Sequence, residues 1–388
     1  MKFGTLKYQY IYKPHNGANY GDNIQTFAVE MLLKKIGIKE ENIVRVNRDT
    51  LAFYYDDNIV LITNGCFYTF PDTNIFPLTN NIIPFYYGLH LTEEWGTRDF
   101  IKKSLPCLKN FKHFEPVGCR DRGTADYLRT LGIKTYYSRC LTYTFPKRLS
   151  NIKDGKVFLV ETPYELNKFI PNEYKNKIEY LTHWPHPLPC SPITDELVDK
   201  YDQEAFKILN RYKEEAILVV TKRLHCAIPC IAMGIPVIVI HENPKNQRMS
   251  SLLDITKIYS YQEFDKINWH PKPLNIESLK REIELNFLLN LIKFDKKYKL
   301  KLLPKKNTLK CNFELLFLKI FNWIKYKNKF KNLCFILSSI LQFYIKYEHN
   351  TFKCYLFNRF PHIFRVKAKI LNFIQIDISF GKYKIFTR

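Results

Sequence analysis

The sequence lacks the cysteine spacing of a structural zinc site. Its 10 cysteines include no Cys-x-x-Cys pair and form no close set with histidine, which excludes zinc fingers and zinc ribbons. The N-terminal stretch MKFGTLKYQYIYKP also lacks the apolar run of about 7 to 15 residues that a secretory signal needs. We therefore expect a cytoplasmic protein with free thiols, and nothing in the sequence calls for a metal or a cofactor.

Long apolar runs are missing, and acidic residues are scarce towards the C-terminus. No stretch reaches the roughly 18 consecutive apolar residues of a membrane-spanning helix. Residues 301–388 contain 18 Lys and Arg but only three acids, and 19 of them are aromatic. This segment therefore carries most of the net charge of +23. Such a surface attracts polyanions, which include nucleic acid, anionic lipid and acidic substrates.

The chain is rich in apolar residues. The chain has 388 residues, of which 46% are hydrophobic and only 13 are glycine. That length exceeds what one hydrophobic core usually serves, so we expect two globular domains and an appendage.

The first part of the chain alternates strands with helices. We expect a strand within 2–10, a turn over 15–22, and a helix that begins at Asp22 or Asn23 with Asp22 as its N-cap. A strand over 59–63 and a helix over 122–131, followed by a strand over 133–137, continue the alternation. This order favours a parallel α/β sheet.

The pattern restarts after residue 150. A strand over 157–160, a helix over 195–214, a strand over 216–220, a short helix over 224–233 and a strand over 236–240 form a second module. We predict two Rossmann-like domains, at 1–150 and 151–300. Residues 301–388 are expected to form a basic, aromatic-rich helical extension, which either packs on the second domain or lies on a membrane surface.

Three segments place polar residues where doubly wound sheets bind ligands, at the carboxyl ends of strands. They are His15 to Asp22, Gly118 to Thr124 and Thr221 to Pro229. The first can be an Asp-capped turn without a ligand, and the second can be an internal ion pair between Arg120 and Asp121. The third sets two cations and a histidine between apolar elements, where an unpaired charge is costly. A bound anion would remove that cost.

In order along the chain, these motifs resemble the polysaccharide pyruvyl transferase family. The resemblance runs from about Leu6 to Asp254, and its main motifs are Asn19-Tyr20-Gly21-Asp22, Gly118-Cys119-Arg120-Asp121, Arg223-Leu224-His225 and Gly234-Ile235-Pro236. It implies two Rossmann-like domains that face a cleft, as in B-type glycosyltransferases. It also implies transfer of a pyruvyl group from phosphoenolpyruvate to a sugar of a surface polysaccharide, such as a capsule, or to its lipid-linked precursor.

The resemblance assigns the donor anion to Arg223, Leu224 and His225. Ketal formation needs an acid that protonates the methylene carbon and a base that accepts the hydroxyl proton of the sugar. We take His225 as the acid and Asp22 as the base. Lys222 and Lys245 are expected to assist at the phosphate. The candidates on the acceptor side, or with secondary roles, are Asn19, Tyr20, Gly21, Arg120, Asp121, His90 and His183.

Two alternatives remain open at this point. A B-type glycosyltransferase could use the same Arg and His residues for the diphosphate of a nucleotide sugar. A nucleic-acid-binding protein would explain the basic aromatic segment, although that segment has no recognised binding fingerprint.

For the pyruvyl transferase, the expected partners are phosphoenolpyruvate, a glycan or lipid-linked oligosaccharide, and an anionic membrane surface. The corresponding location is the cytoplasm, with a peripheral position on the inner face of the plasma membrane.

Overall fold

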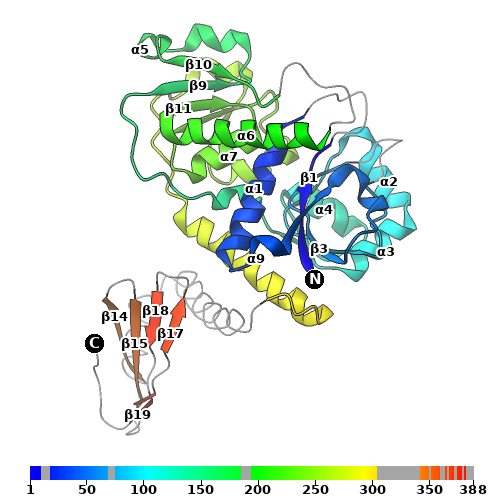
Figure 1. Ribbon diagram of the computed structural model, residues 1–388. Coiled ribbons are helices and arrows are strands. Elements are labelled where there is room, and N and C mark those ends of the chain that lie inside the picture. The colour runs from blue at the N-terminus through cyan, green and yellow to red at the C-terminus, as the bar shows by residue number, and fades with distance from the viewer. Residues whose placement is uncertain are drawn as a thin grey trace. The chain divides into compact units, whose positions relative to one another are not determined.

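A computed structural model of the chain divides into two compact units, Met1–Phe287 and Leu288–Arg388 (Figure 1). The first unit holds two α/β modules in succession. The second contains the basic C-terminal segment. The structure describes residues 1–9, 18–68, 75–184 and 194–303, and the strand residues between 341 and 381.

The first module is built on parallel strands. One sheet has the order β2-β1-β3-β5, and a second has the order β4-β6-β7-β8. Because β4 follows β3 after two residues and β6 follows β5 after three, the two sheets continue each other across a break. Read across that break, the order is that of a doubly wound sheet. The bounds are β1 Lys2–Lys7, β2 Ile43–Asn47, β3 Ile59–Ile62, β4 Gly65–Phe67, β5 Ile82–Phe85, β6 Leu89–Leu91, β7 Val117–Cys119 and β8 Thr135–Tyr137.

Asn64 and Gly88 shape the break between the two sheets. Asn64 Oδ1 accepts a hydrogen bond from the Leu141 backbone N–H at 3.1 Å. Gly88 has a φ of +75°, and a Cβ at this position would lie 2.1 Å from Asn64 Oδ1. Only glycine combines that backbone conformation with so close an approach.

The helices of the first module begin close to strand ends. Helix α1 (Tyr20–Lys35) is capped by Asn19, whose side chain accepts from the Gly21 N–H. Our expectation of Asp22 as the N-cap was therefore wrong, because the helix begins earlier than the apolar periodicity suggests. Helix α4 (Arg122–Thr130) is capped by Asp121. The remaining helices are α2 (Thr97–Lys103), α3 (Leu105–His113) and the 3-10 helices η1 Glu40–Asn42, η2 Arg48–Phe53, η3 Glu94–Gly96 and η4 Leu141–Thr144.

The second module repeats the same winding. Its parallel strands β9 (Lys156–Val160), β10 (Ile178–Leu181), β11 (Ala216–Thr221), β12 (Val237–Ile240) and β13 (Ile258–Tyr259) have the order β10-β9-β11-β12-β13. Numbered within the module, this order is 2-1-3-4-5, in which ligands bind at the switch between the first and third strands. The helices are α5 (Asn172–Lys175), α6 (Asp195–Glu215), α7 (Leu224–Ala232) and α8 (Ser250–Leu253), with the 3-10 helices η5 Tyr164–Phe169, η6 Gln247–Met249 and η7 Tyr261–Lys266.

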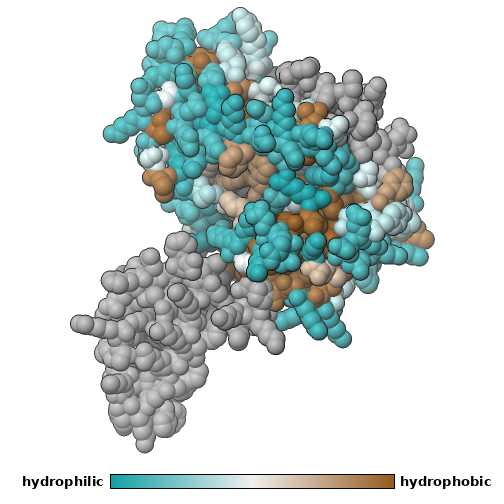
Figure 2. Space-filling view, viewed as in Figure 1, coloured by the Kyte–Doolittle hydropathy of each residue, from teal (hydrophilic) through white to brown (hydrophobic). Residues whose placement is uncertain are grey.

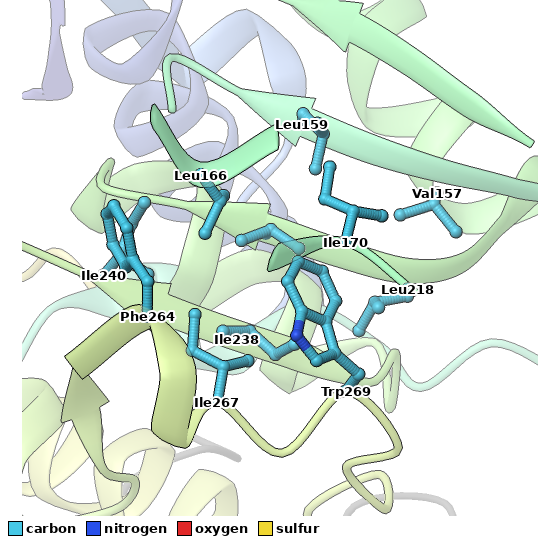
Figure 3. Close-up of a cluster of buried hydrophobic side chains, with 11 residues drawn as sticks. Val157, Leu159, Leu166, Ile170, Leu218, Ile238, Ile240, Phe264, Ile267 and Trp269 are labelled. Atoms are coloured by element: carbon cyan, nitrogen blue, oxygen red, sulfur yellow. The ribbon is translucent and has the colours of Figure 1, made fainter. Parts of the chain in front are cut away.

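One face of this second sheet carries a hydrophobic core (Figure 3). Alternate residues of each strand point to this face, as the two-residue period of a strand requires. Burying one such aliphatic side chain contributes about 1.5 to 3 kcal/mol. The core holds the strand ends that carry the candidate site in fixed positions. Its members are Val157, Leu159, Leu166, Ile170, Leu218, Val220, Ile238, Ile240, Phe264, Ile267 and Trp269.

Helix α9 (Glu277–Tyr298) returns to the first module after the second is complete. The Tyr87 hydroxyl donates to the Ile283 carbonyl at 3.0 Å. The Phe287 ring packs edge-on against Phe85 and Tyr87, with centroids 5.6 and 5.1 Å apart. A late segment of the chain therefore completes the core of the first module.

The second unit contains strands where helices were expected. Strands β15 and β14 pair along eight residues each, and the path β17-β18-β15-β16-β19 completes the sheet. The sequence LQFYIKYE of β14 is rich in aromatic and β-branched residues, and such residues favour strands. The expectation of helices was therefore wrong for the described residues, while 304–340 lie outside them. The bounds are β14 Leu341–Glu348, β15 Thr351–Asn358, β16 Ile363–Phe364, β17 Lys367–Ile370, β18 Ile374–Asp377 and β19 Phe380–Gly381.

The surface of the first unit is mixed in character. Figure 2 shows hydrophilic residues over most of the drawn face, with hydrophobic residues gathered in a smaller area near its middle. Among the helices that the structure describes, none has both the length and the apolar character needed to span a bilayer.

Candidate active site

The three segments singled out in the sequence come together in the first unit, as far as the structure describes them; residues 15–17 of the first segment lie outside the described residues. Helix α1 packs against α7 (Figure 1). Both helices also pack against η4. The Tyr20 N–H at the start of α1 donates to the His183 carbonyl, which follows β10 of the second module, at 2.9 Å. Elements of both modules therefore meet at the start of α1.

Arg120 lies at the centre of this region. Its side chain follows β7 and is completely buried. Nη1 donates to Gln25 Oε1 at 2.8 Å and lies 3.4 Å from Nε2 of His225. Nε and Nη2 have no hydrogen-bond partner in the described part of the chain. A buried guanidinium with unused donors is costly, so these two nitrogens suit an anionic ligand.

His225 is in the first turn of α7 and is almost fully buried. Its Nε2 also lies 3.8 Å from the Cys140 thiol. Burial, and then the charges of Arg120 and Arg248, hold the pKa of His225 well below its usual range. The imidazole is therefore neutral at pH 7. Gly21 allows α1 to approach this ring, since a Cβ there would lie 3.2 Å from the His225 Cβ.

Arg223 precedes His225 at the N-terminus of α7. Its Nε donates to Glu161 Oε2 at 2.5 Å, and its guanidinium lies over the Trp184 ring, 4.4 Å from the centroid. Nη2 is buried and unpaired within the described residues. The Nε–H group of Arg223 is thus bound to Glu161, while Nη2 still has N–H groups that could bind a ligand. Sequence reasoning missed Glu161, although an acid directly after the buried strand β9 was a usable signal.

The other donor-side candidates are placed differently. Leu224 is buried. Lys222 and Lys245 are exposed, and no hydrogen bond or ion pair among the described residues joins their side chains to Arg120 or His225. Arg248, in η6, was not predicted. Its charge lowers the pKa of both His90 and His225, so it acts on the same region.

Asp22 belongs to a buried hydrogen-bond network. Its Oδ2 lies 3.4 Å from Arg48 Nη1, and its Oδ1 accepts from Gln25 Nε2 at 3.1 Å. Arg48 also donates to Asp49 at 2.9 Å. Gln25 therefore bridges Asp22 to Arg120, and Arg120 contacts His225. The candidate base and the candidate acid lie at opposite ends of one chain of polar contacts.

His90 and Asp121 form a second buried pair. His90 Nδ1 lies 2.6 Å from Asp121 Oδ2, and the Thr124 hydroxyl donates to the same carboxylate oxygen at 3.2 Å. Burial, with a smaller contribution from Arg120, lowers the pKa of His90 to about 4. We therefore assign a neutral imidazole that donates its Nδ1–H to an ionised Asp121. The alternative of an ion pair between Arg120 and Asp121 is not what the structure shows, because Asp121 pairs with His90 instead.

His183 connects the second module to the start of α1. Its Nε2 lies 2.9 Å from the Tyr212 hydroxyl, and the two rings stack with centroids 6.1 Å apart. Together with the Tyr20 contact, this fixes the end of β10 against the start of α1. The described residues contain no group of three or more His, Cys, Asp or Glu that could hold a metal ion.

Comparisons with known proteins give one family and several solved structures. A family model described as polysaccharide pyruvyl transferase matches residues 19–243, more than half of the chain. No curated protein sequence matches the chain. Among solved structures, the chain is similar to an uncharacterised protein from Klebsiella pneumoniae, with 14% identity, 64% of this chain and 86% of that chain covered, and a TM-score of 0.36. It is also similar to accessory secretory protein 1,2 and 3 of Streptococcus pneumoniae, with 13% identity, 64% and 55% covered, and a TM-score of 0.36. The alignment thus spans about half of that second protein.

Proposed function

Because the chain belongs to the polysaccharide pyruvyl transferase family, we propose that it transfers the pyruvyl group of phosphoenolpyruvate to a sugar. Membership of the family makes it a transferase that acts on polysaccharide. The proposed acceptor is a sugar of a cell-surface polysaccharide or its lipid-linked precursor.

One observation carries the choice of an anionic donor. The guanidinium of Arg120 is completely buried, and two of its nitrogens have no partner within the described residues. Arg223 offers a further buried, unpaired nitrogen two residues before His225. Phosphoenolpyruvate carries a carboxylate and a phosphate, whose oxygens match the planar N–H pairs of a guanidinium. Arg120, first expected on the acceptor side, is thus proposed to bind the donor.

The reaction then needs one proton donor and one proton acceptor. His225 would protonate the methylene carbon of the donor, which leaves a cationic centre at C2. A sugar hydroxyl attacks C2 and loses its proton to Asp22. The C2–O bond to phosphate breaks, and a second hydroxyl closes the ketal and gives its proton to the departing inorganic phosphate. The proton on Asp22 then passes to water. Each such proton transfer typically contributes about 10² to 10⁴ in rate. The contacts Asp22–Gln25–Arg120–His225 support these roles, because they connect both groups to the Nη1 end of Arg120.

The test separates a pyruvyl donor from a glycosyl donor. Purified protein is incubated with a glycan library and with either phosphoenolpyruvate or a set of nucleotide sugars, and the product masses are read. We expect a pyruvyl mass increment with phosphoenolpyruvate only, together with a raised melting temperature when that donor alone is added. Transfer of a sugar residue from a nucleotide sugar would instead establish the B-type glycosyltransferase.

A further inference from the structure

The lone pair of Nε2 of His225 can either bind a proton or accept a hydrogen bond from Arg120, but not both. Arg120 Nη1 is 3.4 Å from this nitrogen. An arginine can only donate, so we assign the lone pair of Nε2 to the side that faces Arg120 and the ring proton to Nδ1. A second proton on Nε2 would then face an N–H of Arg120. The imidazole can gain that proton only if Arg120 turns its N–H elsewhere.

The groups packed around His225 oppose a positive charge on its ring. Arg120 after β7 and Arg248 in η6 are cations, and a positive charge on His90 in β6 or on His183 after β10 would act in the same direction. Cys140, before η4, is also in contact with Nε2. The acids nearby are already engaged, because Asp22 on α1 accepts from Arg48 and Gln25, and Asp121 before α4 accepts from His90 and Thr124.

An anion at Arg120 would remove both obstacles. It would offer oxygens to the unpaired Nε and Nη2 and so draw the guanidinium towards itself. It would also reverse the sign of the local charge, because a carboxylate and a phosphate bring more negative charge than Arg120 alone brings positive charge. The attraction of an anion for an imidazolium is large at a site shielded from water.

We propose that binding of a polyanion at Arg120 is coupled to uptake of one proton from water by Nε2 of His225. Binding of the donor would therefore protonate the residue that later acts as the acid. This inference rests on the proposed function. In the reaction, that proton moves from Nε2 to the methylene carbon of the donor, and the ring returns to its neutral form. The site therefore holds a charged acid only while an anionic donor is bound.

Calorimetry measures this proton directly. Phosphoenolpyruvate is titrated into the full chain at one pH in buffers with different enthalpies of ionisation, and the slope of the measured enthalpy against buffer enthalpy gives the protons taken up. Inorganic sulfate is titrated in parallel, because it does not itself titrate near neutral pH. We expect about one proton for each ligand with the wild-type chain, and almost none with His225→Gln. His113→Gln is the control, since His113 is an exposed histidine at the end of α3, outside the candidate site, and it should retain the uptake.

A second measurement does not depend on any variant folding. The dissociation constant of sulfate for the wild-type chain should rise with pH, by about tenfold for each pH unit over the range in which binding takes up one proton. Anion binding with no proton uptake and no pH dependence would overturn the proposal and leave the proposed function standing. Uptake that persists in His225→Gln, or that disappears in His113→Gln, would also overturn it. Failure of phosphoenolpyruvate to bind at all, when nucleotide sugars do bind, would overturn the proposed function instead.

Discussion

Two buried arginines of the site differ in how far their donors are used. Arg48 donates to Asp22, Asp49 and the Cys66 carbonyl, and its guanidinium lies 4.7 Å from the Tyr8 ring centroid. Arg120 uses Nη1 alone, which donates to Gln25 and faces Nε2 of His225, and keeps two nitrogens unpaired among the described residues. The first is therefore part of the scaffold, while the second is ready to bind a ligand.

This difference predicts the effect of Arg120→Lys. An ammonium keeps the charge but cannot present two coplanar N–H groups to a carboxylate or a phosphate. Affinity for phosphoenolpyruvate should fall by roughly 10- to 100-fold, as expected for the loss of one charge-assisted hydrogen bond. Calorimetric titration measures it. Arg122→Lys is the control, because Arg122 is exposed and pairs with Asp254, and unchanged affinity in Arg120→Lys would remove Arg120 from the donor site.

Asp22→Asn tests the base. The substitution removes the charge that faces Arg48, so it should cost about 1 to 3 kcal/mol of stability, whereas the cap of α1 is kept by Asn19. Turnover should fall by about 10² to 10⁴, with donor affinity retained. Asn19→Ala is the comparison, since it loses the cap, at a cost of about 1 kcal/mol, but keeps the carboxylate. Near-normal turnover by folded Asp22→Asn would leave the aspartate with a structural role alone.

The pKa of His90 makes stability depend on pH. Its usual value of 6.5 is lowered to about 4 in the folded protein, so between these values the unfolded chain binds a proton that the folded protein does not. The contribution of His90 to the free energy of unfolding is therefore fully present above about pH 6.5, and it decreases as the pH falls towards 4. At pH 5 this group should cost about 2 kcal/mol relative to pH 7.

Urea unfolding at pH 7 and pH 5 measures this dependence. In His90→Gln the difference between the two midpoints should shrink, because glutamine does not titrate. His113 is exposed, at the end of α3, so His113→Gln should leave the difference as in the wild type. An unchanged difference in His90→Gln would contradict the assignment of a neutral His90.

At the scale of elements, the broken strands of the first module place the site. The break puts Asn64 where its side chain holds the start of η4, and η4 packs against both α1 and α7. A rearranged break should therefore disturb the position of His225 relative to Arg120.

Gly88→Ala tests this element. An alanine would adopt an unfavourable backbone conformation, at about 1 to 2 kcal/mol, and its Cβ would overlap Asn64. Gly132→Ala is a close control, because Gly132 has a φ of +74° but nothing within 4 Å of a Cβ. We expect Gly88→Ala to lose about 1 to 3 kcal/mol more than Gly132→Ala in urea unfolding. Equal losses would show that the contact with Asn64 is easily relieved.

The sequence was sufficient for the alternation of strands and helices, because apolar runs such as Val157–Val160 and Val237–Ile240 carry a local signal. It was also sufficient for the segments around Arg120 and Arg223, which follow such strands. It was not sufficient for the residues that complete the site, because their roles depend on contacts between distant parts of the chain: Gln25, Arg48, Asp49, Glu161 and Arg248. The start of α1 was misplaced because its first turn is polar.

At the scale of the whole molecule, the charge is concentrated in the second unit. We propose that residues 301–388 hold the protein at an anionic membrane surface, where a lipid-linked acceptor would be found. A chain that lacks these residues should no longer float with anionic vesicles, while its first unit should remain folded. Flotation with anionic and with neutral vesicles measures this. Continued flotation of the shortened chain would place the contact elsewhere, and a salt-dependent shift with nucleic acid would favour the other polyanion.

The return of α9 to the first module has a consequence for synthesis. Sheet formation in that module is complete at Tyr137, but Ile283 and Phe287 cover Tyr87 only after about 150 further residues have left the ribosome. At roughly 5 to 20 residues per second, this delay is about 8 to 30 seconds. The aromatic surface of Phe85 and Tyr87 stays uncovered throughout that time. The second module is synthesised later but can therefore finish folding before the first. A chaperone that acts during translation would bind the exposed aromatic surface of the first module.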